Sequence, residues 1–158
     1  MRKSKVADKP TQGNKHRYFS YREAWARITS ANRQGFYLES VTIVESILSD
    51  RIRSYMQAQH IFLDESRFIS LSKRVGEWRK IEKNNISFKD FDCLISAVTE
   101  WVNRRNIVVH AIVSQRIAER ESIDDFLSFS KTTAQDGAKL ARAVSAWTRT
   151  KKLIRSEN

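Results

Sequence analysis

The clearest helical pattern in this chain lies in residues 91–113, which read FDCLISAVTEWVNRRNIVVHAIV. Apolar residues recur there three or four positions apart, which is the period of one face of an α-helix. They are Leu94, Ile95, Val98, Trp101, Val102, Val108, Val109, Ile112 and Val113. The pattern predicts a long helix over about residues 88–115. At its start, Ser87 with Asp90 three positions later predicts a capping box.

Three polar residues interrupt the second half of this predicted helix. Arg105 falls on the apolar stripe, where an unpaired charge is costly. Asn106 and His110 are four positions apart and share a face, whereas Arg105 and His110 are about 140° apart around an ideal helix. Only the long arginine side chain would let both reach one ligand. A cation, an amide and an imidazole so close together suggest a phosphate-handling site, and the alternative is that His110 is a hydrogen-bonded residue of the core.

Residues 105–110, which read RNIVVH, resemble the Arg-x4–6-His motif of the HEPN superfamily (higher eukaryotes and prokaryotes nucleotide-binding). In that family asparagine commonly follows the arginine, as it does here. The resemblance covers roughly residues 18–155, and its specific part is these six residues. It implies a metal-independent endoribonuclease without a cofactor, in which the 2′-hydroxyl of the RNA attacks the adjacent phosphate and leaves a 2′,3′-cyclic phosphate. Arg105, Asn106 and His110 would be its catalytic residues.

The residue types suit that reaction. Histidine transfers protons near neutral pH, and arginine and asparagine can stabilise negative charge on a phosphate in the transition state. Because one histidine cannot easily make both proton transfers, the resemblance implies a homodimer formed through the motif helices. It also suggests a toxin or phage-defence effector with an antitoxin or regulatory protein as partner. HEPN toxins silenced by a nucleotidyltransferase usually carry tyrosine two positions after the histidine, and Ile112 in that position argues against such a partner.

Two further charged residues are candidates for supporting roles. Glu45 interrupts an apolar stripe of the helix predicted over residues 35–59, so its carboxylate needs a partner of opposite charge. Arg105 also lies on an apolar stripe and needs such a partner. We therefore expect Glu45 to support the motif arginine, and the alternative is a glutamate at the boundary that reaches solvent. Arg104 is expected to contact phosphate or to be solvated. Glu39 and Asp50 are expected to face solvent.

Composition agrees with a helical domain inside a reducing compartment. The chain has 158 residues, enough for one domain, with only four glycines and one proline. The single cysteine, Cys93, has no partner for a disulfide, and the histidines and the cysteine show no metal-ligand spacing. Neither a membrane-length apolar run nor a signal-peptide pattern is evident, so we expect a cytoplasmic protein with no membrane segment and no metal.

The net charge of +11 is concentrated at the two ends of the chain. Residues 1–17 contain six basic residues and one acid, which predicts a flexible basic arm preceding a single helical domain over residues 18–158. Nucleic acid is the first candidate partner for such a surface. Within the arm, the expected RNA contacts are Lys3, Lys5, Lys15 and Arg17. The alternative is that basic tails only aid solubility.

Five helices are expected, arranged as an all-α, up-and-down bundle. Their predicted ranges are about 21–32, 35–59, 71–83, 88–115 and 133–155, with a short helix around 124–129. The side chains expected inside are Tyr21, Trp25, Ile28, Leu38, Val41, Leu48, Ile52, Tyr55, Val75, Trp78, Ile81, Leu140, Val144 and Trp147.

Three functions remain open on the sequence alone. The first is the HEPN-type endoribonuclease. The second is a catalytically silent helical module that binds RNA or protein, and the third is an unrelated helical protein such as a DNA-binding protein of a mobile element. Cleavage of RNA would separate the first from the other two.

Overall fold

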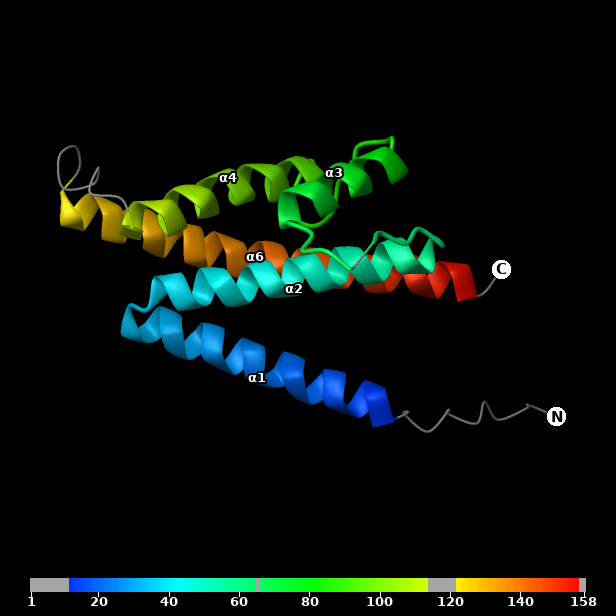
Figure 1. Ribbon diagram of the computed structural model, residues 1–158, viewed down its shortest axis with the longest axis horizontal. Helices are drawn as coiled ribbons and strands as arrows, with labels where there is room; N and C mark the ends of the chain where they lie inside the picture. Colours follow the sequence, from blue (N-terminus) through cyan, green and yellow to red (C-terminus); the bar gives the residue numbers. More distant parts are fainter. Residues whose placement is uncertain (1–11, 65, 114–121, 157–158) are drawn as a thin grey trace.

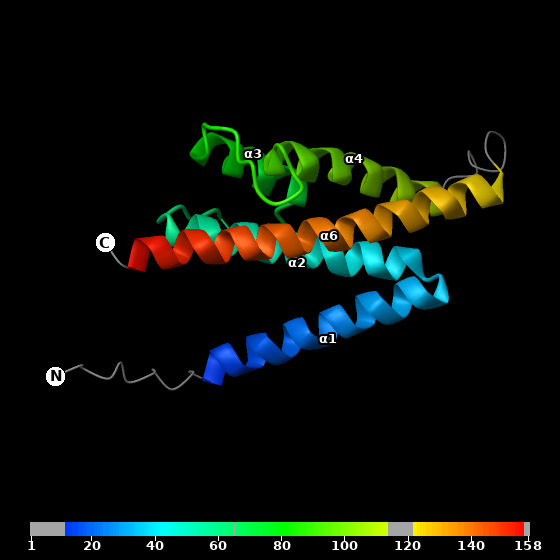
Figure 2. The same ribbon diagram turned by 180° about the vertical axis from the view of Figure 1, so that it is seen from behind.

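The structure is a computed structural model that describes residues 12–64, 66–113 and 122–156. Over these residues it has five α-helices and no β-strand, which confirms the all-α bundle. The helices are α1 (Gln12–Gln34), α2 (Tyr37–Ala58), α3 (Leu71–Ile81), α4 (Leu94–Val113) and α6 (Ile123–Ser156). Figures 1 and 2 show α2 and α6 side by side, with α3 and α4 on one side of this pair and α1 on the other. None of these five helices is both long enough and apolar enough to cross a membrane.

Two helices are longer than the sequence pattern predicts. Helix α1 begins at Gln12, so residues 12–17 are helical rather than part of a flexible arm that ends at residue 17. The remaining residues of that arm lie outside the described part of the chain. Helix α6 runs without interruption over the short helix and the fifth helix that the sequence predicted separately. Within its polar segment, the hydroxyls of Thr132 and Thr133 donate to the carbonyls of Ser128 and Phe129 one turn earlier.

The predicted capping box at Ser87 and Asp90 is wrong, because α4 begins only at Leu94. The backbone groups of Phe88 and Phe91 bond to each other, at 2.9 and 3.1 Å, and close a tight turn. Lys89 inside this turn has a φ of 51°, which is incompatible with a helix. The Leu94 N–H then donates to the Ile86 carbonyl at 2.8 Å, so the chain folds back on itself before the helix starts.

The turn between α1 and α2 uses glycine for its backbone conformation. Gly35 has a φ of 82°, and the Phe36 N–H donates to the Ala31 carbonyl at 2.8 Å. This is the pattern of a glycine-terminated helix, in which a left-handed residue lets the next amide bond back to the last turn. The turn makes α1 and α2 antiparallel, and Figures 1 and 2 show α1 diverging from α2 toward its N-terminus.

An aromatic cluster lies at the centre of the core. The Trp147 ring of α6 contacts Tyr55 of α2 and Trp78 of α3, with centroids 4.7 and 5.2 Å apart. Most of the predicted inward residues are buried, while Tyr21, Trp25 and Ile81 are partly buried. The prediction is wrong for Leu38, which is 37% exposed because it lies in the first turn of α2 at the end of the bundle.

Helices α4 and α6 meet at a close contact between Trp101 and Gly137. The Trp101 Nε1–H donates to the Thr133 carbonyl at 2.9 Å. A β-carbon placed on Gly137 would lie 2.5 Å from the indole nitrogen, closer than real atoms approach. Glycine is therefore required here by the packing of the indole ring against the α6 backbone.

We expect Gly137→Ala to lower the free energy of unfolding by about 1–3 kcal/mol, because the new methyl group forces the indole ring or α6 to shift. The matched control is Gly76→Ala in α3, where a β-carbon would meet nothing within 4 Å. That change should stabilise the protein by about 0.5–1 kcal/mol, since alanine favours a helix interior. Urea unfolding measures both variants, and equal effects in the two would contradict the packing argument.

Candidate functional site

The motif arginine is bound by side chains on two helices. Arg105 of α4 forms an ion pair with Glu45 of α2, and its Nη1 donates to the Oδ1 of Asn106 at 2.9 Å. The Arg105 and Glu45 side chains are 25% and 21% exposed, so both lie at the edge of the core. The Arg105 Nε is buried and has no hydrogen-bond partner among the described residues. The pairing of Glu45 with Arg105, which the sequence suggested, is therefore present.

Arg104, the neighbouring arginine, turns toward a different helix. Its Nη1 lies 2.9 Å from the Oδ2 of Asp136 on α6, and its guanidinium lies 5.7 Å from the centre of the Phe129 ring. The side chain is 25% exposed. Arg104 thus contributes to the contact between α4 and α6, and part of its charge is already balanced by a carboxylate.

His110 does not lie with the other two motif residues. It is exposed in the last turn of α4, and within the described part of the chain it neither bonds to Arg105 or Asn106 nor lines the cleft beside Arg105. Exposure also means that it is not a core histidine. One copy of the chain therefore brings together Arg105, Asn106 and Glu45, and leaves His110 on the surface.

A cleft of about 470 Å³ opens beside Arg105, between α2, the start of α3 and α4. It contains three guanidinium groups, two carboxylates, two serines and an apolar wall. The residues that line it are Glu45, Ser46, Ser49, Asp50, Arg53, Phe68, Ile69, Leu71, Arg74 and Arg105. The three arginines give the cleft the donors that a phosphate group needs, and the carboxylates hold two of them in place.

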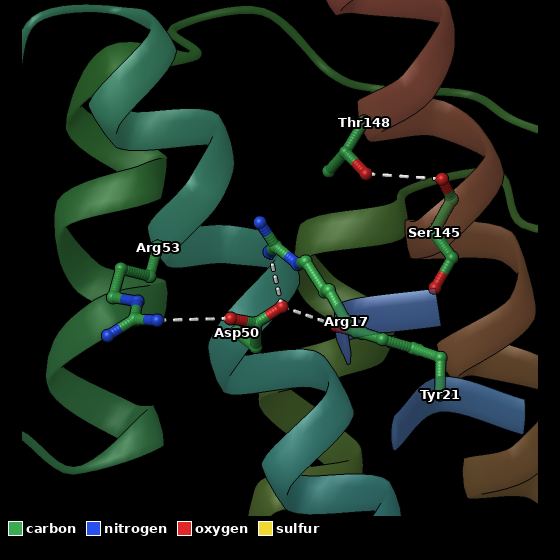
Figure 3. Close-up of polar contacts among 6 residues, drawn as sticks. All are labelled: Arg17, Tyr21, Asp50, Arg53, Ser145 and Thr148. Carbon is green, nitrogen blue, oxygen red and sulfur yellow. Dashed lines mark hydrogen bonds and ion pairs between the residues drawn. The ribbon is translucent and has the colours of Figure 1, made fainter. Parts of the chain in front are cut away.

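Asp50 is half-buried at the edge of this cleft, although the sequence suggested a solvent-facing residue. Its Oδ2 accepts from Arg17 Nη2 at 2.6 Å and from the Tyr21 hydroxyl, and its Oδ1 accepts from Arg53 at 3.2 Å (Figure 3). The i, i+4 spacing places Arg17 and Tyr21 on one side of α1, but it does not reveal their shared partner Asp50, which lies on α2. Glu39, by contrast, is exposed as expected.

The Asp50 contacts change the acidity of the groups involved. Partial burial of Asp50 opposes its ionisation, but the hydrogen bonds from Tyr21 and Arg17 outweigh burial and hold its pKa below the ordinary value. Partial burial and the hydrogen bond to Asp50 raise the pKa of Tyr21 to about 12. At neutral pH Asp50 is therefore a carboxylate that joins α1 to α2.

The predicted RNA contacts at the N-terminus fall into three groups. Lys3 and Lys5 lie outside the described residues. Lys15 is exposed on α1 and free to meet a ligand, while Arg17 is 44% exposed and paired with Asp50. Beside them are two exposed aromatic residues, Tyr18 and Phe19, which the sequence analysis did not single out.

Over the described residues, no group of three or more His, Cys, Asp and Glu side chains is arranged to hold a metal ion. Comparison with known proteins gives no match to a family model, to a curated protein or to a solved structure. The function of this protein is therefore inferred from the motif and from the geometry around it.

We expect Asp50→Asn to lower the free energy of unfolding at neutral pH by about 1–2 kcal/mol, because it removes charge-assisted bonds from Arg17 and Arg53 that are partly screened by solvent. The pKa of Asp50 is depressed in the folded protein, so this contribution is present above the unfolded pKa of about 3.9 and is lost as the pH falls below it.

Urea unfolding of the wild type and the Asp50→Asn variant at neutral and at acidic pH tests this. The difference between the two should shrink in acid. Asp92→Asn, a matched change at an exposed position, should have little effect at either pH. A deficit for Asp50→Asn that stays constant into acid would contradict the role of its charge.

Proposed function

We propose that this protein is a metal-independent endoribonuclease of the HEPN type. The observation that carries the proposal is the arrangement of Arg105, which Glu45 and Asn106 hold at the edge of a cleft that also contains Arg53 and Arg74. This geometry supports binding of a phosphate diester, because arginine presents several N–H donors in a fixed plane. The substrate would be cytoplasmic RNA.

Each motif residue then has a chemical role. The 2′-hydroxyl of the RNA attacks the adjacent phosphorus and the 5′-oxygen leaves, which gives a 2′,3′-cyclic phosphate. Arg105 stabilises the negative charge that develops on the phosphate oxygens. Because the Asn106 Oδ1 accepts from Arg105, its Nδ2 group remains as a donor to the same phosphate. His110 transfers a proton, either from the attacking hydroxyl or to the leaving oxygen.

The position of His110 supports a site built from two copies of the chain. Within one copy His110 is exposed and outside the Arg105 cleft. Ile107, one turn earlier on the same exposed side of α4, is 57% exposed, although it is a large apolar residue. Pairing of two α4 helices through this side would bury Ile107 and bring the two histidines close together at the interface. A ribonuclease of this kind fits a toxin or a phage-defence effector restrained by an antitoxin or regulatory protein.

The ion pair of Glu45 with Arg105 also favours a second function, that of a binding module without catalytic activity. Glu45 already balances the charge of Arg105, and His110 has no partner within its own chain among the described residues. Both features suit a silent module that binds RNA or a protein through its basic surfaces. The two functions differ in whether the wild-type protein cleaves RNA.

We expect His110→Ala to abolish RNA cleavage while the fold is retained, because alanine removes the proton-transfer group and favours a helix. Arg105→Ala should be about as severe, and Asn106→Ala milder. Gel analysis of a labelled RNA should show cyclic-phosphate ends and cleavage that persists in EDTA.

His60→Asn is the matched control for the loss of an imidazole. His60 is exposed and has a φ of 58°, a conformation that asparagine also adopts, so this variant should keep wild-type activity. Wild-type activity in His110→Ala, or inhibition by EDTA, would show that the proposed chemistry is wrong. A folded wild type that cleaves no RNA would favour the silent module.

A shared site predicts that the purified protein is a dimer. Ile107→Glu should give a folded monomer with unchanged helix content but without cleavage activity, because the side chain is exposed in a single copy. Light scattering with size-exclusion chromatography measures the mass. Phe62→Gln is the control, because it removes a side chain that is 71% exposed without adding a negative charge near Arg53 and Arg74, and it should remain dimeric and active. Cleavage by a monomer, whether wild type or Ile107→Glu, would exclude a site built from two copies.

A further inference from the structure

One face of α1 combines basic and aromatic side chains and covers no part of the core. Lys15, Tyr18, Phe19 and Arg22 occupy positions i, i+3, i+4 and i+7, so they lie within an arc of about 100° on the helix. All four are exposed, and Tyr18 and Phe19 are 65% and 59% exposed. We call these four residues the α1 surface. Helix α1 packs on the bundle through its other side, where Ile28 is buried.

The two aromatic rings of the α1 surface lie next to each other without a structural role. Their centroids are 5.7 Å apart and their planes make an angle of 72°. Neither ring belongs to the core cluster or to the partly buried residues that pack against it. Large exposed aromatic side chains of this kind offer flat faces to a ligand that stacks.

The charge around these rings is positive. Lys15 and Arg22 flank them, and the nearby acids are already engaged. Glu23, at the edge of this surface, bonds to Arg27 at 2.9 Å, and Asp50 accepts from Arg17 and Tyr21. Among the residues that the structure describes, no carboxylate pairs with Lys15 or Arg22, so the α1 surface presents uncompensated cations beside aromatic faces.

We propose that the α1 surface binds single-stranded RNA, with bases stacked on Tyr18 and Phe19 and phosphates bound by Lys15 and Arg22. Stacking on aromatic rings between cations is the general mode by which single strands are bound without sequence preference. The surface spans about 10 Å along the helix, which suits a short single strand. The choice of RNA over DNA rests on the proposed function, whereas the surface itself is separate from the Arg105 cleft.

Two other occupants fit the surface less well. A helix that lies in a membrane interface needs a wide apolar face, but here the apolar part is two rings between cations. A second copy of the chain would bring the same positive charge to the contact. Single-stranded nucleic acid matches both the charge and the exposed rings.

The test measures binding apart from cleavage. All proteins carry His110→Ala, so the RNA stays intact, and fluorescence anisotropy follows a labelled single-stranded oligouridine. The double change Tyr18→Ala and Phe19→Ala should weaken binding about tenfold or more. Arg22→Ala should weaken it and reduce the dependence on salt by about 0.7 in the log–log slope, the value for one phosphate contact with a single strand.

Matched controls separate this surface from general loss of charge or aromatic area. Phe62→Ala removes an exposed ring elsewhere, and Lys83→Ala removes an exposed cation just after α3, away from α1. Both should leave the affinity within about twofold, an effect well below one stacking contact. Circular dichroism of each variant checks that α1 still forms.

The inference fails if the double aromatic variant binds oligouridine as tightly as its parent, or if its affinity for phosphatidylserine vesicles falls while RNA binding is unchanged. Binding that depends on Tyr18 and Phe19 supports it even when the wild type cleaves no RNA, and that result would count against the ribonuclease alone. Cleavage by the wild type with no role for the α1 surface would leave the ribonuclease and remove this inference.

Discussion

The contact of Trp101 with Gly137 sets the spacing between α4 and α6, and the position of the motif residues depends on that spacing. The indole ring occupies the space that the β-carbon of any residue other than glycine at position 137 would need. Its N–H donates to the Thr133 carbonyl. One turn further along α4, Arg105 lies on nearly the same side of the helix as Trp101. The close packing of α4 on the bundle thus brings its guanidinium to Glu45 of α2.

Consecutive arginines on α4 reach different helices because adjacent residues are about 100° apart around the helix axis. Arg104 pairs with Asp136 on α6, and Arg105 pairs with Glu45 on α2. Partly exposed ion pairs contribute little stability, typically about 0.2–1 kcal/mol. Their main effect here is to orient the two guanidinium groups. Arg105 faces a cleft with two further arginines, which is the arrangement that makes it the better candidate for a phosphate contact.

Asp50 links the cleft beside Arg105 to helix α1. It lines the cleft that contains Arg105, and it also accepts hydrogen bonds from Arg17 and Tyr21 of α1 (Figure 3). Tyr18 and Phe19 lie between those two residues in the sequence, so the same carboxylate holds the part of α1 that carries the exposed rings.

Periodicity and composition were sufficient to predict an all-α bundle, most of its core and the pairing of Glu45 with Arg105. An apolar stripe and a charge within it are local properties of a helix, which is why the sequence alone reveals them. Local patterns were misleading at Ser87 and Asp90, where the reciprocal bonds of Phe88 and Phe91 replace a helical turn. They were also misleading on Asp50, which was expected to face solvent but accepts hydrogen bonds from another helix. His110 was grouped with Arg105 by the sequence, but the fold leaves it on the surface. Which side chains meet depends on how the helices pack against one another, and that packing arises from contacts between residues far apart in the chain.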